Sequence, residues 1–117
     1  MQVYYKCSRC GFSAETNIWL WRCPKCGGPI DVVIEGLKLT LNGRRDMWKF
    51  SSVIPAKPLV SLGEGFTPLV RAGFLGKNVN LKLEYLNPTG SFKDRGSAVA
   101  ISKALEFNAN TVVEDSS

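Results

Sequence analysis

The chain has 117 residues, enough for one ordinary domain or two small modules but too few for a two-lobed enzyme with two full cores. With 44% hydrophobic and 21% charged residues, it has the composition of a folded protein, and its longest apolar runs are too short to cross a bilayer. The sequence contains no histidine, which removes the commonest general base and the Ser/His and Cys/His nucleophile pairs.

The net charge of +5 is concentrated in the middle of the chain. Residues 1–35 carry net +1, residues 36–58 net +4 and residues 59–117 net zero. A short basic segment is more typical of a solvated linker than of a nucleic-acid surface, so nucleic acid is not an expected partner. The first residues lack the basic and apolar regions of a signal peptide, so we expect a reducing, cytoplasmic setting without membrane attachment.

Four cysteines mark residues 1–35 as a small metal-binding ribbon. They form two C-x2-C pairs separated by twelve residues, and a glycine follows each pair: Cys7, Cys10, Cys23 and Cys26. Two residues between thiolates let a tight turn direct both sulfurs at one ion, and four sulfurs suit structural zinc with no open catalytic position. Rubredoxin-like iron and two disulfides are the alternatives.

The ribbon is expected to consist of short strands around the two cysteine turns. Residues 3–5, 18–21 and 30–35 are rich in β-branched or aromatic side chains, as strands are. We interpret Trp19 and Trp21 as packing residues of this module.

Residues 36–58 are interpreted as a basic linker that lies along a surface. Leucines at positions 37, 39 and 41 alternate with polar residues and predict a weak strand, which ends at the turn Asn42-Gly43. Residues 44–50 predict one helical turn, from which Met47 and Phe50 could dock on the following domain. Two nearby prolines then interrupt regular structure.

Residues 59–117 predict one strand–helix–strand unit. Residues 80–85 alternate apolar and polar side chains, residues 87–90 have turn composition, and Ser91 is placed to cap a helix that ends near Asn108. Residues 111–114 indicate a second, buried strand, so the order predicts a parallel sheet with a right-handed crossover. Such an incomplete sheet has open edges, and we therefore expect either self-association by edge pairing or segment exchange, or a rearrangement of residues 59–117 into a different fold.

Lys93 is the candidate reactive residue of this unit. It lies at the start of the predicted helix, where the helix dipole disfavours a cation, and a neutral amine there could attack an aldehyde. The neighbouring Asp94 and Arg95 cannot share its face, so we expect them to cap the helix, anchor the loop or pair with other parts of the fold. A solvated helix lysine without chemistry is the alternative.

Three segments resemble pyridoxal-phosphate enzymes of fold type II, the tryptophan synthase β-like family, and within it the threonine synthases. Residues 81–96 resemble the family's cofactor-lysine segment, with the sequence LKLEYLNPTGSFKDRG. Residues 62–69 resemble its Gly-Glu-Gly-x-Thr-Pro-Leu element, and residues 112–117 the strand before its Ser-Ser-Gly-Asn loop. Archaeal-type threonine synthases also carry a four-cysteine ribbon. The fold class implied is α/β: a zinc ribbon at 1–35, a linker at 36–58 and the first part of the catalytic domain at 59–117.

The resemblance also implies a reaction and a set of site residues. Lys93 matches the lysine that holds pyridoxal phosphate and moves protons on the substrate, Ser116 and Ser117 match the loop that grips the substrate carboxylate, and the four cysteines match the zinc ligands. The reaction implied converts O-phospho-L-homoserine and water to L-threonine and phosphate.

Alternatives to this reading remain open. The chain stops before the glycine and asparagine that complete the family's loop, so we expect a fragment that is inactive alone. A related enzyme such as a cysteate synthase or a threonine/serine dehydratase is one alternative. A zinc-ribbon adaptor that binds RNA or protein through Arg44 and Arg45 is the other.

Overall fold

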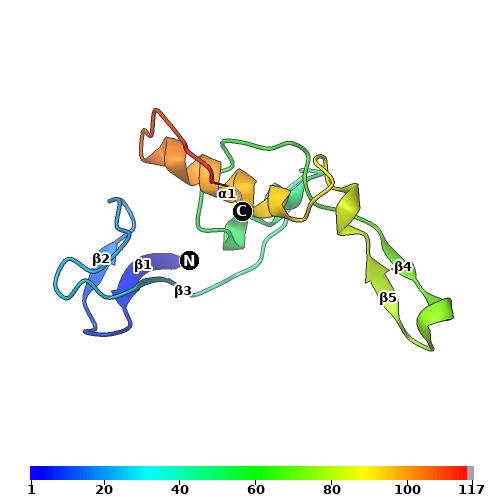
Figure 1. Ribbon diagram of the computed structural model, residues 1–117, viewed down its shortest axis with the longest axis horizontal. Coiled ribbons are helices and arrows are strands. Elements are labelled where there is room, and N and C mark those ends of the chain that lie inside the picture. The colour runs from blue at the N-terminus through cyan, green and yellow to red at the C-terminus, as the bar shows by residue number, and fades with distance from the viewer. Residues whose placement is uncertain (116–117) are drawn as a thin grey trace.

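The computed structural model describes residues 1–115 as three parts joined by irregular segments. A small antiparallel sheet lies at one end, a two-stranded hairpin lies at the other, and a single α-helix with the chain that wraps it lies between them (Figure 1). The only α-helix in this described range has 14 residues, too short to span a membrane.

The first sheet is built around its central strand. Strands β1 (Gln2–Cys7), β2 (Ser13–Glu15) and β3 (Ile30–Glu35) lie in the order β2-β1-β3, and both pairings are antiparallel. Because side chains alternate along β1, Tyr5 and Cys7 are buried on one face while Gln2 and Lys6 are exposed on the other. The strands predicted at 3–5 and 30–35 are confirmed.

The strand predicted at 18–21 is wrong, because these residues form turns and irregular backbone. The expectation that Trp19 and Trp21 are packing residues is wrong as well, since they are 67% and 69% exposed. Trp19 instead meets Phe107 edge to face, with ring centroids 5.6 Å apart, and Arg22 covers the Trp21 ring. A run of aromatic residues without a partner strand therefore forms surface contacts rather than a strand.

The connector contains one short 3-10 helix, Met47–Val53, and no strand. Asp46 caps this helix by accepting a hydrogen bond from the Trp48 amide at 3.0 Å. The helical turn and the docking of Met47 are as predicted, whereas Phe50 is 38% exposed. The strand predicted at the alternating leucines is wrong: Leu37, Leu39 and Leu41 are exposed and lie in irregular backbone.

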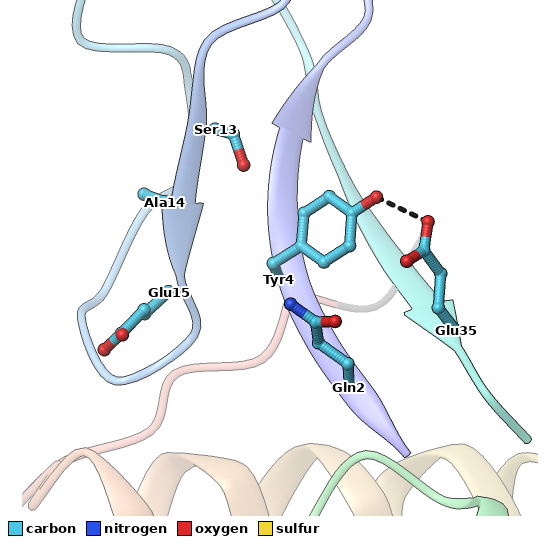
Figure 2. A pocket seen from close by; sticks show the side chains of 6 residues that line it. All are labelled: Gln2, Tyr4, Ser13, Ala14, Glu15 and Glu35. Atoms are coloured by element: carbon cyan, nitrogen blue, oxygen red, sulfur yellow. Dashed lines mark hydrogen bonds between the residues drawn. The ribbon is translucent and has the colours of Figure 1, made fainter.

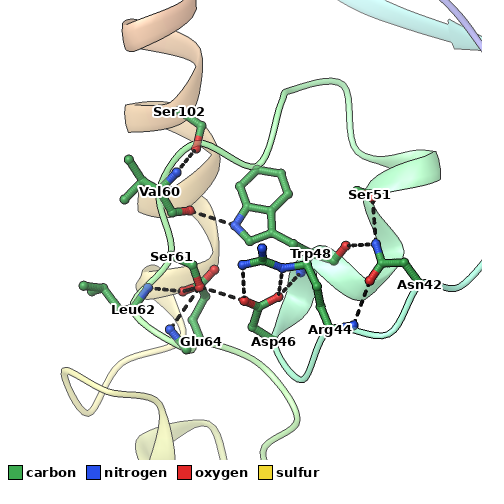
Figure 3. A network of polar contacts seen from close by, with 11 residues as sticks. Asn42, Arg44, Asp46, Trp48, Ser51, Val60, Ser61, Leu62, Glu64 and Ser102 are labelled. Carbon is green, nitrogen blue, oxygen red and sulfur yellow. Dashed lines mark hydrogen bonds and ion pairs between the residues drawn. The ribbon is translucent and has the colours of Figure 1, made fainter.

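Trp48 is the centre of the small apolar core. It is fully buried with Met47 and Ala98, and Ile54, Ala56 and Val99 pack around them. Its indole Nε1 donates to the Val60 carbonyl at 2.8 Å, and the Val60 amide donates to the Ser102 hydroxyl at 3.0 Å (Figure 3). The connector is thereby fixed to the helix through one aromatic side chain and two hydrogen bonds.

The helix predicted after Ser91 is α1 (Lys93–Glu106). Ala98 and Ser102 are buried on its inner face, and the chain leaves the helix through Asn108, whose φ of 56° is left-handed. Asparagine tolerates this conformation better than most residues, so its role as the predicted stop agrees with the structure.

The parallel strand–helix–strand unit predicted for residues 80–114 is wrong for the chain as described. Strand β5 (Asn80–Lys82) pairs antiparallel with β4 (Leu69–Arg71), and the predicted strand ends early because Glu84–Leu86 turns into a 3-10 helix. Residues 111–114 form no strand, and Val112 and Val113 are exposed rather than buried. Local pattern predicted strand character here but could not identify the pairing partner.

We predict that Trp48→Ala unfolds the central part of the chain. Removing a fully buried tryptophan typically costs about 3–5 kcal/mol, and two segments lose their common contact. Thermal unfolding followed by near-ultraviolet circular dichroism measures this loss. Trp21→Ala is the matched control, because it removes an exposed indole and should change stability by less than about 0.5 kcal/mol. Equal effects of the two substitutions would contradict this assignment of the core.

Candidate functional site

The four cysteines come together in two turns of identical design. In each turn the first cysteine donates its amide to a carbonyl five residues ahead, and the following glycine donates back to the first cysteine. Gly11 and Gly27 have φ values of 72° and 67°, which favour glycine. Because both turns have this geometry, they bring the two cysteine pairs together, and the four thiols form one cluster.

The sulfur geometry suits a single tetrahedral ion. The four Sγ atoms lie within 4.8 Å of one another, and the pairs Cys7–Cys26 and Cys10–Cys23 are 3.6 Å apart. Four ligands at the usual Zn–S distance of about 2.3 Å would be about 3.8 Å from one another. All four cysteines are free thiols, so the structure does not contain the two disulfides that were the alternative.

The thiols differ in their readiness to ionise. Amide hydrogen bonds from Cys10 and Arg9 lower the pKa of Cys7 from 9.0 to about 7 despite its burial. The Gly28 amide favours the Cys26 thiolate, but burial and the neighbouring Cys10, Cys7 and Cys23 together raise the pKa of Cys26 to about 12. A bound cation would remove this conflict by stabilising all four thiolates at once.

A separate pocket lies on the opposite face of the ribbon sheet. It is lined by Gln2, Tyr4 and Glu35 together with residues of β2, and the Tyr4 hydroxyl donates to Glu35 at 2.8 Å (Figure 2). This hydrogen bond raises the pKa of Tyr4. The pocket is shallow and contains none of the cysteines, so it is not part of the metal site.

Lys93 is exposed at the first residue of α1. Its amide donates to the Ser91 hydroxyl at 3.2 Å, so Ser91 supports the helix start although Phe92 occupies the capping position. The lysine and the exposed Phe92 line an open hollow of about 510 Å³ with Arg95, Gly96, Ser97 and Ala100. The structure therefore leaves the amine accessible to a ligand from solvent.

Asp94 anchors the helix start to the preceding turn. Its side chain is 5% exposed and accepts hydrogen bonds from the Thr89 amide, at 2.8 Å, and from the Thr89 hydroxyl. Because adjacent helix residues point in different directions, burial of Asp94 helps turn Lys93 outward. The predicted role of Asp94 in capping or loop anchoring is confirmed.

Arg95 anchors the helix start a second time, by binding the carboxylate of Glu84. We call Glu84 and its three donors, Arg95, Thr67 and Asn87, the Glu84 clamp. Arg95 binds Glu84 through Nε at 2.8 Å and Nη2 at 2.9 Å. Thr67 and Asn87 donate to the same carboxylate at 2.5 Å and 3.0 Å. These donors, Arg95 first, lower the pKa of Glu84 from 4.5 to about 2. The clamp thus joins the lysine helix to the loop before β4.

The glycine-rich loop at 63–67 is fixed from the other side by Glu64. This fully buried carboxylate accepts hydrogen bonds from the Leu62 amide at 2.7 Å and from Ser61 at 3.1 Å (Figure 3). Gly65 has a φ of 104°, and a Cβ there would lie 2.9 Å from the Met47 amide nitrogen. Glycine is therefore required at the position where loop and connector touch.

Sequence reasoning missed Glu64, Thr67 and Glu84 as members of this arrangement. The resemblance covered the loop and the lysine segment but assigned these side chains no role. The one available signal for Glu84 was that it is the single acidic residue of the mostly apolar segment 80–86, which precedes the basic residues Lys93 and Arg95 at the start of α1. The remaining site residues predicted from sequence, Ser116 and Ser117, lie outside the described residues.

Comparisons with known proteins identify the family to which the lysine-bearing half of the chain is similar. Residues 60–117 match the family model described as pyridoxal-phosphate dependent enzyme. A threonine synthase of Methanosarcina acetivorans is 33% identical over 93% of this chain and 30% of its own length. One from Methanocaldococcus jannaschii is 32% identical over 92% and 30%, and one from Synechocystis sp. is 52% identical over 48% and 16%. No solved structure matches significantly.

Residues 60–117, which contain the exposed Lys93 and its anchored neighbours Asp94 and Arg95, belong to the pyridoxal-phosphate-dependent enzyme family. Within that family the chain is similar to threonine synthases of archaea and bacteria. It spans less than a third of the length of these relatives.

We predict that Glu84→Gln removes an acid-sensitive part of the stability. The folded-state pKa of Glu84 lies below its ordinary value of 4.5, so its contribution is complete above about pH 5 and is lost as the pH falls towards 2. The melting temperature of the variant should lie below that of the wild type at pH 6.5, and the difference should shrink towards pH 2.5.

Asp31→Asn is the control for this experiment, because Asp31 is exposed on the ribbon and lies outside the clamp. The melting temperature of Asp31→Asn should equal that of the wild type at both pH values. A Glu84→Gln difference that is independent of pH would show that the carboxylate charge does not stabilise the clamp.

Proposed function

We propose that this chain supplies the lysine-bearing segment of a threonine synthase, the enzyme that converts O-phospho-L-homoserine and water to L-threonine and phosphate. The observation that carries the proposal is Lys93, whose amine is accessible while Asp94 and Arg95 are fixed on either side of the helix start. The names of the relatives supply the product, threonine. The substrate is the one implied by the resemblance of residues 81–96 to the family's cofactor-lysine segment.

Lys93 would hold pyridoxal phosphate covalently, and the bound cofactor would act as the electron sink of the reaction. The amine of Lys93 would also take and return protons at the substrate's α and β carbons. Asp94 and the Glu84 clamp would keep that amine in place without contacting the substrate. Ser116 and Ser117 are proposed to bind the substrate carboxylate.

The chain by itself is proposed to be inactive. All residues that line the hollow beside Lys93 come from positions 92–100, so one short segment forms the whole surface. A cofactor site encloses its ligand from several directions, and most of a bound ligand's surface is normally buried. Lys93 thus fits the covalent anchor, while enclosure would come from elsewhere in a complete enzyme.

We propose zinc as the occupant of the cysteine cluster, with a structural role. Four sulfur ligands leave no position for water or substrate, and the distances between the sulfurs suit a tetrahedral ion. The ribbon buries few apolar side chains, principally Tyr5, Cys7 and Cys23, so a metal would supply much of its stability.

We expect zinc in one equivalent per chain when the protein is purified without chelator, as measured by elemental analysis. Cys23→Ser should unfold the ribbon while α1 remains folded, because the Trp48 core contains no ribbon residue. Amide exchange of β1–β3 compared with that of α1 reports this difference. Bound iron would contradict the proposal, as would an intact ribbon after complete removal of the metal.

The threonine synthase assignment is tested in a chimera in which this chain replaces the matching part of the Methanosarcina acetivorans enzyme. The chimera should release phosphate from O-phospho-L-homoserine and form threonine. Lys93→Ala should lower the rate by about 100- to 10,000-fold, as expected for loss of an acid–base residue. Lys77→Ala, in the exposed hairpin, is the matched control. A different product, or unchanged turnover in Lys93→Ala, would overturn the assignment.

The isolated chain should react with pyridoxal phosphate weakly and without selectivity. Borohydride reduction followed by peptide mapping should find pyridoxyl groups on Lys93 at levels comparable to those on Lys38 and Lys77, because a single helix face cannot bind the cofactor's phosphate. Strong labelling confined to Lys93 would show that the chain already contains a complete cofactor site.

A further inference from the structure

The β4–β5 hairpin has no packing partner in the described structure. Its strands hydrogen-bond to each other, and it projects away from α1 and from the ribbon sheet (Figure 1). Leu69, Phe74 and Leu75 are 66%, 84% and 56% exposed. A two-stranded hairpin is marginally stable in water, and both of its outer edges are open to another strand within residues 1–115.

A second segment also has strand composition but no partner. Residues 111–115 read TVVED and make no strand hydrogen bonds in the described structure. Val112 and Val113 are 58% and 87% exposed, although valine strongly favours the half-buried surface of a sheet. One chain therefore carries both an open sheet edge and an unpaired strand.

The two segments are complementary in charge and in pattern. Residues 69–83 contain Arg71, Lys77 and Lys82 and no acidic residue, whereas residues 111–115 end in Glu114 and Asp115. If residues 112–114 lie parallel to β4, Val112 stands beside Leu69, Val113 beside Val70 and Glu114 beside Arg71. Apolar and opposite-charge neighbours across strands both stabilise a sheet.

The segments cannot meet within one copy as it is folded. Residues 111–113 lie against the carboxyl-terminal half of α1, where they line a groove with Ala100, Ala104 and Trp19. The hairpin instead connects to the amino-terminal end of the same helix, and a helix of 14 residues is about 21 Å long. A second copy of the chain is therefore the occupant that the geometry favours.

We propose that two copies of this chain associate by exchanging these strands, so that residues 111–115 of each copy add to the β4 edge of the other. The exchange is symmetric and uses the same contact twice. The chain exposes 8424 Å², whereas a compact protein of 12.9 kDa exposes about 6,300 Å², so the folded chain leaves more surface free for a partner than a compact protein does.

The proposal is tested on the full chain by multi-angle light scattering over a concentration series. We expect a dimer that dissociates on dilution. Glu114→Arg and Arg71→Glu should each weaken the dimer about 10-fold, because each introduces two like-charge contacts. The double variant, with the charges exchanged, should recover to within about 3-fold of the wild type. Lys77→Glu, in the hairpin turn, is the matched control and should change the dissociation constant by less than about 3-fold.

Hydrogen exchange distinguishes this dimer from other outcomes. In the dimer the amides of β4 and of residues 111–115 should become protected together as the concentration rises. A monomer at all concentrations overturns the proposal, and so does protection of these amides in a monomer, which would mean that the strand folds back within one copy. A dimer that is unaffected by both charge reversals would place the interface elsewhere and would also overturn it.

Discussion

The carboxylate of Glu84 is the interaction on which the arrangement around Lys93 depends. It binds Arg95 from α1, Thr67 from the loop before β4 and Asn87 from the turn before the helix. These donors come from three segments with no strand pairing among them. The bidentate, charge-assisted pair of Arg95 and Glu84 holds both side chains in one orientation. An apolar contact of the same area would allow the two segments to slide past each other. The clamp therefore fixes direction as well as proximity.

Polar ties of this kind take the place of a large apolar core. Trp48 is the one large aliphatic or aromatic side chain among the fully buried ones, and Asp46, Glu64 and Asp94 are buried around it or near the helix start. Asp46 and Asp94 accept hydrogen bonds from backbone and side-chain donors, which offsets the cost of removing them from water. Glu64 accepts hydrogen bonds through Oε2, whereas its Oε1 is buried without a partner. Because such networks specify geometry more than they stabilise, the central part of the chain should be well defined but only marginally stable. Its radius of gyration of 17.5 Å, against about 13 Å for a compact chain of this length, reflects the same shortage of apolar burial.

The parts of the fold that depend on neighbouring residues in sequence could be predicted, and the parts that depend on distant partners could not. Cysteine spacing predicted the cluster of four thiols, and the pattern after Ser91 predicted α1 and its end near Asn108. Strands were predicted at 18–21, 37–41 and 111–114 from composition, yet a strand requires a second strand, and these segments have none in the described structure. The role of Lys93 came from its position and resemblance. For Arg95 the sequence predicted a role in anchoring or pairing, which the structure confirms, but it could not identify the partners Glu84 and Thr67, which lie 11 and 28 positions away.

If Lys93 has the proposed role, the order Lys93-Asp94-Arg95 divides anchoring and reaction between neighbouring residues. Successive helix residues are about 100° apart around the axis, so three neighbours cannot face the same way. Asp94 is bound by Thr89 and Arg95 by Glu84, and both contacts lie on the protein side of the helix. Lys93 has no such partner among the described residues and is exposed at the open hollow, whose wall also includes Arg95. A lysine one position earlier or later would point its amine either towards the contacts of Asp94 and Arg95 or away from the hollow. The position of the lysine is therefore determined by its two neighbours and by their partners Thr89 and Glu84.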